Sequence, residues 1–295
     1  MNRKLTLPAV ACIAGLAISQ TGFSATLASP GLVATGLITQ AITMKVPGTN
    51  ADLCGSTQLN TLQDALGCLS HYQIANTGMV TIEMTQSPTT PYQPVVIDHP
   101  NGNHIEIVGD CTAESADGIC TIPFIQSGFI VSGGKTLKQL SNFKLVGQNK
   151  VYEQHNTTGI GAFSGGSIAI NNIDVSGFGW GIHSTSNGQL TASEVSAHNN
   201  LYGFDTEYSS FMQVHNVRAT NNTYGFYVAS NASMLIASGS NSATSNSSAD
   251  FYLNRSSALY CLGESSLTVN TVYQGFASTS NNTVCGPKFK AHGAG

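Results

Sequence analysis

Three side chains in the middle of the chain have the types needed for acid–base chemistry: His183, Asp205 and Glu207. Two carboxylates that flank a glycosidic bond can act as acid and base in its hydrolysis. A neighbouring imidazole can transfer protons near neutral pH. If the fold brings these side chains together, we expect Asp205 and Glu207 to be the acid and the base, with His183 in support. The alternative is that all three are simply solvated on a surface.

The spacing of these residues follows a repeat. Cut before Gly159, Gly181, Gly203 and Gly225, the sequence gives four consecutive blocks of 22 residues. Such self-similarity indicates stacked supersecondary units. Apolar residues alternate with polar ones over three short stretches in each block, which predicts three strands per block. A parallel β-solenoid follows, whereas the pattern of a leucine-rich repeat is missing from the sequence. After Asn246 the register shifts by three residues.

The repeat predicts which side chains share an outward column. Equivalent positions on successive coils lie about 4.8 Å apart, and alternate residues of one strand about 6.6 Å apart. His183, Asp205 and Glu207 should therefore form one exposed cluster, bordered by Tyr227 and Tyr252, whose rings could stack on sugars. A carboxylate separation of about 6.6 Å would lie near the range of inverting glycosidases.

A second, weaker group of candidate ligand-binding residues is Asp174, Arg218 and His198. Asp174 and Arg218 fall two coils apart, about 9.6 Å, so we do not expect them to pair directly.

Two sets of like residues recur at the period and should form structural ladders. Asn199 and Asn200 precede Asn221 and Asn222 by 22 residues, which predicts an amide ladder. The aromatic residues that close successive blocks should also stack on one another: Trp180, Tyr202 and Tyr224.

The repeats and the runs Thr61–Leu66, Val80–Ile82 and Val95–Gly102 resemble the right-handed parallel β-helix of pectin-lyase-like proteins, most of all the β-helical segments of phage tail fibres and tailspikes. The resemblance covers roughly residues 60–262. It implies a fold and an association with surface polysaccharides, and it leaves assembly into a homotrimer open. Its motifs specify architecture and not catalytic residues.

Calcium-dependent polyuronate lyases within that fold are not favoured. Calcium requires several converging oxygen ligands, and no outward column of the repeat stacks three acids. Arg218 and Arg255 are the only arginines after the N-terminal segment, although uronates would require cationic partners. We therefore predict no metal and no cofactor.

The N-terminus resembles a secretory signal peptide over residues 1–24, with a basic start and a short apolar run. That run is too short to span a membrane, so the mature chain should be secreted or periplasmic and lack an integral membrane segment. Residues 25–50 read as an aperiodic leader and residues 288–295 as a frayed tail. The β-helix domain takes residues 51–287, with a capping helix from Thr61 to His71 that begins with a capping box to Asp64.

Six cysteines remain after the signal peptide, an even number in a chain bound for an oxidising compartment. Sequence proximity pairs Cys54 with Cys68, Cys111 with Cys120, and Cys261 with Cys285. A structural zinc site is disfavoured because no C-x-x-C pair is present.

Charged residues make up 9% of the chain and the net charge is −4. A nucleic-acid partner would require a basic stripe, and none is visible. We therefore predict an all-β, secreted, right-handed parallel β-helix that binds surface or extracellular polysaccharide. The alternatives are a polysaccharide-degrading enzyme, either a glycoside hydrolase or a lyase, and a structural or adhesive spacer.

Overall fold

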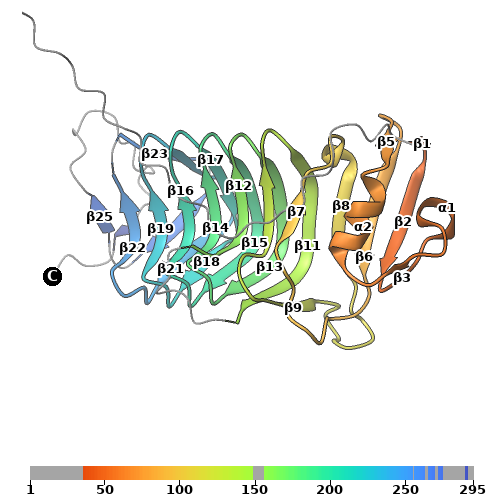
Figure 1. Cartoon of the computed structure of the whole chain (residues 1–295). Coiled ribbons are helices and arrows are strands. Elements are labelled where there is room, and N and C mark those ends of the chain that lie inside the picture. The colour runs from red at the N-terminus through yellow and green to blue at the C-terminus, as the bar shows by residue number, and fades with distance from the viewer. Residues whose placement is uncertain are drawn as a thin grey trace, which may run out of the picture. The chain divides into compact units, whose positions relative to one another are not determined.

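The computed structural model describes residues 36–148, 156–254, 256–262, 265–269, 272–274 and 290–291. The predicted signal peptide at residues 1–24 lies outside the described residues. Residues 34–295 form one compact unit, and its described part consists mostly of β-strands (Figure 1). Among the described residues, no helix is long and apolar enough to cross a lipid bilayer.

Two long sheets build this unit, and all strand pairs within them are parallel. The eight-stranded sheet contains β7 (Val95–Ile97), β10 (Phe129–Ser132), β12 (Thr158–Phe163), β14 (Trp180–Thr185), β16 (Tyr202–Thr206), β19 (Tyr224–Val228), β22 (Ala249–Leu253) and β25 (Val272–Gln274). The fourteen-stranded sheet contains β2 (Ala41–Val46), β6 (Met79–Met84), β8 (Ile105–Gly109), β9 (Cys120–Phe124), β11 (Thr136–Gly147), β13 (Ser167–Ser176), β15 (Gln189–His198), β17 (Phe211–His215), β18 (Arg218–Thr220), β20 (Ser233–Ile236), β21 (Ser240–Thr244), β23 (Ala258–Cys261), β24 (Ser266–Val269) and β26 (Lys290–Ala291).

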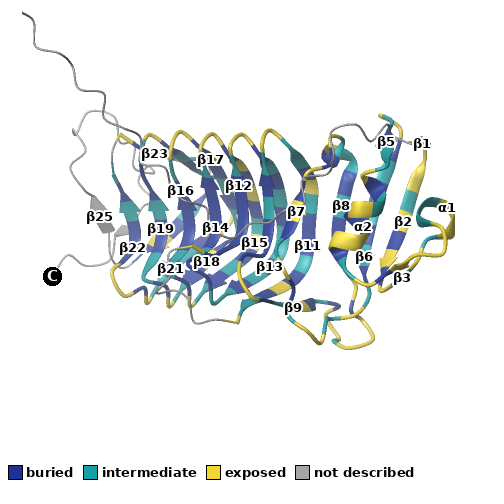
Figure 2. Cartoon of the chain, viewed as in Figure 1, coloured by how far each residue is buried: buried dark blue, intermediate teal, exposed yellow. Residues whose placement is uncertain are grey.

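The chain alternates between these sheets, and each strand pairs with the equivalent strand of the next block. Ile182 of β14 pairs with Phe204 of β16, which pairs with Phe226 of β19. All three side chains are fully buried, and Figure 2 shows the buried positions running along the strands. The predicted three-residue shift is confirmed, since Phe226 pairs with Phe251. Stacked parallel sheets in this register are compatible with a β-solenoid.

The predicted amide ladder is confirmed for its buried members. The Oδ1 atom of Asn222 accepts from the backbone N–H of Asn200 at 2.9 Å, and the Oδ1 atom of Asn246 accepts from that of Asn222 at 2.9 Å. The side-chain amide of Asn222 also donates to the carbonyl of Ala197 at 3.0 Å. Each ladder asparagine thus satisfies backbone groups where the chain turns between the sheets, which buried polar groups require.

The recurring glycine at the start of each block has a steric cause. A Cβ atom on Gly203 would lie 2.7 Å from the carbonyl oxygen of Gly225 and 2.8 Å from Nδ2 of Asn222. Neither neighbour can easily move, because the Gly225 carbonyl belongs to the backbone of the next coil and Asn222 belongs to the amide ladder. Close backbone approach therefore fixes glycine at this position.

The predicted capping helix is present as α2 (Leu62–Leu69). Thr61 and Asp64 form the predicted capping box, and Leu62, Leu66 and Leu69 are buried. Small elements surround it: β1 (Gly36–Ile38), β3 (Gly48–Thr49), α1 (Ala51–Cys54), β4 (Gln58–Leu59), β5 (Tyr72–Ile74) and the 3-10 helix η1 (Gly102–His104).

The expected leader at residues 25–50 is wrong over its described part. Strand β2 pairs in parallel with β6 along its whole length, and its side chains Met44 and Val46 are fully buried. Alternate burial in Ala41–Val46 follows the strand period. The sequence carries this period, since Ile42, Met44 and Val46 alternate with Thr43 and Lys45, but the stretch is short and lies outside the 22-residue repeat.

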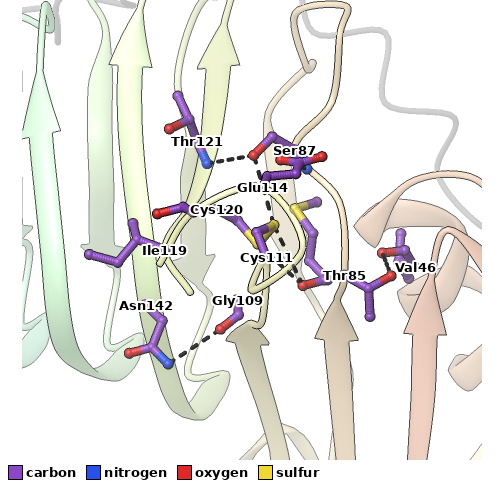
Figure 3. Close-up of a disulfide and its surroundings, with 12 residues drawn as sticks. Val46, Thr85, Ser87, Gly109, Cys111, Glu114, Ile119, Cys120, Thr121 and Asn142 are labelled. Carbon is purple, nitrogen blue, oxygen red and sulfur yellow. Dashed lines mark hydrogen bonds between the residues drawn. A yellow bond between two sulfur atoms is a disulfide. The ribbon is translucent and has the colours of Figure 1, made fainter. Parts of the chain in front are cut away.

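Two predicted disulfides are confirmed, Cys54–Cys68 and Cys111–Cys120. Figure 3 shows the second, which closes the loop between β8 and β9, and beside it the hydroxyl of Ser87 accepts from the backbone N–H of Thr121 at 3.0 Å. Cys261 is also disulfide-bonded, while its predicted partner Cys285 lies outside the described residues.

Candidate functional site

His183, Asp205 and Glu207 meet on the outward side of the eight-stranded sheet. His183 on β14 pairs in register with Asp205 on β16, and Glu207 directly follows β16. One ligand atom from each of the three lies within 4.8 Å of the others. The predicted juxtaposition is confirmed, and it follows from the repeat alone.

The predicted exposure of this cluster is wrong. Asp205 is 1% exposed and His183 is 7% exposed. The ring of Trp180 stacks on the imidazole of His183, with centroids 5.0 Å apart, and Phe163 packs edge-on at 5.3 Å. The outward-pointing imidazole of His183 is shielded from solvent because the rings of Trp180 and Phe163 pack against it.

The predicted spacing of an inverting glycosidase is wrong as well. The Asp205 and Glu207 oxygens lie within 4.8 Å of each other, whereas inverting enzymes hold their carboxyl groups about 6.5–9.5 Å apart.

Trp180 belongs to this site, although sequence reasoning placed it only in the aromatic ladder. Its indole N–H hydrogen-bonds the carboxylate of Asp205. The signal in the sequence was its position in the same strand, three residues before His183. Trp180 therefore holds both members of the buried pair.

Polar atoms in the cluster are incompletely paired. His183 Nε2 lies 3.7 Å from Asp205 Oδ2, beyond hydrogen-bond range. Both ring nitrogens of His183 and the Oδ1 atom of Asp205 are buried without a hydrogen-bond partner among the described residues. Each such atom costs about 1–3 kcal/mol, so the fold retains this arrangement at the expense of stability.

Burial shifts the two pKa values in opposite directions. The pKa of Asp205 is raised well above its ordinary value, first by burial and second by the negative charge of Glu207, against which the Trp180 hydrogen bond acts. Burial lowers the pKa of His183 from 6.5 to about 3. At neutral pH the imidazole is therefore neutral, and the carboxyl group holds its proton more tightly than an exposed aspartate does.

An array of aromatic rings surrounds the cluster on the same face. Trp180 stacks with Tyr202 at 6.1 Å, and Tyr202 with Tyr224 at 5.2 Å, which confirms the predicted aromatic ladder. Tyr227 and Tyr252 form a second stack at 4.4 Å. The two stacks join edge to face, for example between Tyr202 and Tyr227 at 5.0 Å. We call these five residues the aromatic face.

The rings of the aromatic face are half-buried, and their faces are largely occupied by one another. Tyr202 has Trp180 on one side and Tyr224 on the other. A ligand on this surface would therefore meet ring edges and phenol groups more than open ring faces. Burial raises the pKa of Tyr202 to about 12, with Asp205 as the next cause, so its hydroxyl stays protonated and able to donate.

The second predicted group lies on the other sheet and is divided. His198 Nε2 lies 2.8 Å from Asp174 Oδ1, and Asn199 contacts the other ring nitrogen of His198 at 2.8 Å. Arg218 lies two strands from Asp174, with Ser196 between them in register. Both ring nitrogens of His198 thus have a polar neighbour at 2.8 Å, and Arg218 contributes to neither contact.

Comparison of the chain with models of protein families, with curated proteins and with solved structures gives no match. The function is therefore inferred from the geometry of the cluster and of the aromatic face.

Proposed function

We propose that this chain is a right-handed parallel β-helix that binds a surface or extracellular polysaccharide through its aromatic face. The observation that carries the proposal is the array of five half-buried aromatic residues on the outward side of the eight-stranded sheet. Aromatic residues that gather, partly exposed, on a surface outside the core are a feature of binding sites.

The chemistry of the aromatic face suits a sugar polymer. Tyrosine and tryptophan combine apolar area with a polar end, which matches a ligand that carries both C–H groups and hydroxyls. Successive strands lie about 4.8 Å apart, and the stacked rings on them lie 4.4–6.1 Å apart, so the surface is periodic along the direction in which the strands stack. A linear repeating ligand can use each strand in turn.

The charge around the aromatic face favours a neutral or amino-sugar glycan. Its titratable neighbours include Asp205, Glu207 and the uncharged His183, and Arg218 lies on the other sheet. An acidic polysaccharide would require cationic partners for its carboxylates. Secretion or export to the periplasm fits the disulfides, which persist in oxidising compartments.

A binding panel tests this proposal. The purified protein would be assayed by pull-down and calorimetry against neutral, amino-sugar and acidic polysaccharides. We expect binding to a neutral or amino-sugar polymer, and a loss of about tenfold in affinity for Tyr224→Ala and Tyr252→Ala, because truncated anchors typically cost more than 1 kcal/mol.

Tyr260→Ala is the matched control. Tyr260 is 47% exposed and lies on β23 of the other sheet, so its removal should leave binding unchanged. Equal loss in all three variants, or binding that survives in Tyr224→Ala and Tyr252→Ala, contradicts the proposal. Binding to no polysaccharide leaves the structural or adhesive spacer as the better account.

Polysaccharide cleavage is the second candidate function. It is favoured by the raised pKa of Asp205 beside Glu207, since perturbed acids gather at active sites. The same panel would be followed for new reducing ends and for absorbance from unsaturated products. We expect any cleavage to disappear in Asp205→Asn and Glu207→Gln; cleavage that persists unchanged in both variants removes these residues from catalysis.

A further inference from the structure

We propose that His183, Asp205 and Glu207 bind one divalent transition-metal ion, of which zinc fits best. His183 and Asp205 come from two neighbouring strands and Glu207 directly follows the second, and their candidate ligand atoms lie within 4.8 Å of one another. The proposal departs from our expectation of no metal, which considered only stacked acids and omitted the imidazole of His183.

The distances suit a small ion. Zinc lies about 2.0–2.2 Å from nitrogen and oxygen ligands, so two ligands of a tetrahedral site are roughly 3.4 Å apart. His183 Nε2 and Asp205 Oδ2 are 3.7 Å apart. Glu207 is only half-buried and directly follows its strand, so its flexible side chain can move to ligand distance.

The unpaired atoms of the cluster are a separate observation that points to a ligand. Among the described residues, neither ring nitrogen of His183 nor Oδ1 of Asp205 has a hydrogen-bond partner. Buried polar atoms in native proteins are nearly always paired. A cation between His183 Nε2 and the carboxylates would give the buried Nε2 atom the partner it lacks.

Trp180 would act as a positioning residue for such an ion. Its indole N–H holds the Asp205 carboxylate, and its ring lies nearly parallel to the His183 imidazole, at 14°. Hydrogen bonds and packing around metal ligands commonly fix their orientation.

The donor set favours zinc over calcium or magnesium. Imidazole nitrogen suits zinc and related ions, whereas calcium takes six to eight oxygen ligands. Three protein ligands leave one position of a tetrahedral site for a water molecule. Glu207 is the most exposed of the three side chains, so the ion would enter from its side.

Metal titration of the purified protein tests the proposal without any assay of activity. The protein would be stripped with a chelator and titrated with zinc by calorimetry, and with cobalt by its visible absorption. We expect one equivalent per chain, a higher melting temperature on zinc addition, and a loss of about 100-fold in affinity for Glu207→Gln and His183→Gln. These variants should still melt cooperatively without metal, because neither removes apolar core.

His198→Gln provides the matched control, since it removes the other histidine–carboxylate pair. We expect it to bind zinc as the wild type does. No zinc binding by the wild type, binding unchanged in Glu207→Gln, or binding lost in His198→Gln overturns the proposal. None of these outcomes depends on polysaccharide binding at the aromatic face.

Discussion

His183 and Asp205 occupy the same register position on neighbouring strands, and His183 Nε2 lies 3.7 Å from Asp205 Oδ2 where almost no solvent reaches. Burial raises the pKa of one and lowers the pKa of the other. The pair therefore makes stability depend on pH in two opposite ways, and each can be isolated by one substitution.

Asp205→Asn should raise the stability of the metal-free protein at pH 7. The raised pKa of Asp205 means that, above its ordinary value of 3.8, the folded state binds more protons than the unfolded state. The free energy of unfolding then falls as pH rises through the folded pKa. Asparagine can still accept from Trp180 and carries no charge, so we expect a gain of about 1–3 kcal/mol.

Denaturant unfolding in the presence of a chelator, at several pH values between about 4 and 8, measures this effect. Between the ordinary pKa of Asp205 and its raised value in the folded state, the stability of the variant should fall less with rising pH than that of the wild type. Lower stability of Asp205→Asn at pH 7 contradicts the assignment of a destabilising buried acid.

His183→Gln should protect the protein on the acid side. The pKa of His183 is lowered from 6.5 to about 3, so between these values the unfolded state binds the extra proton and stability falls as pH falls. Glutamine removes that loss. Unfolding curves at pH about 4 and about 7 should therefore differ less in the variant than in the wild type, and an equal difference would show that His183 titrates normally.

Two glycine substitutions should act in opposite directions. Gly203→Ala places a Cβ atom 2.7 Å from a backbone oxygen and should cost about 1–3 kcal/mol through overpacking. Gly67→Ala lies in α2, exposed, with nothing within 4 Å of the added Cβ, and should gain about 0.5–1 kcal/mol from helix propensity. Melting temperatures of the two variants check both signs, and a neutral Gly203→Ala would mean that the strands are packed less closely than described.

The amide ladder should be sensitive only at its buried members. Asn222→Ala leaves the backbone N–H of Asn200 and the carbonyl of Ala197 without their partner, at a cost of about 2–4 kcal/mol. Asn221→Gly is the control, because Asn221 is exposed and its φ of 56° suits glycine; it should change stability by less than about 1 kcal/mol. Chemical denaturation measures the free energy of unfolding of both variants. Equal losses in the two variants would show that the buried ladder does not stabilise the fold.

Periodicity alone predicted the parallel strands, their register and the meeting of His183 with Asp205. It could do so because equal block lengths place residues 22 apart on neighbouring strands. The confirmed stacking of Ile182, Phe204 and Phe226 in the core has the same origin.

What periodicity could not provide was the environment of each outward side chain. Burial of Asp205 depends on the size and side-chain conformation of the neighbouring rings, above all Trp180. An alignment of the repeats does not give these conformations. Strand β2 was missed for a different reason: it lies before the regular blocks, where no repeat marks its register.

The central claim is that the aromatic face is the surface that binds polysaccharide, and Trp180 reports on it directly because it is the only tryptophan of the chain. Its fluorescence would be followed while the polysaccharide selected by the binding panel is added. We predict a saturable change in emission that Tyr224→Ala weakens and Tyr260→Ala leaves intact. Binding detected by calorimetry without any change in Trp180 emission would contradict the claim and place the binding surface elsewhere.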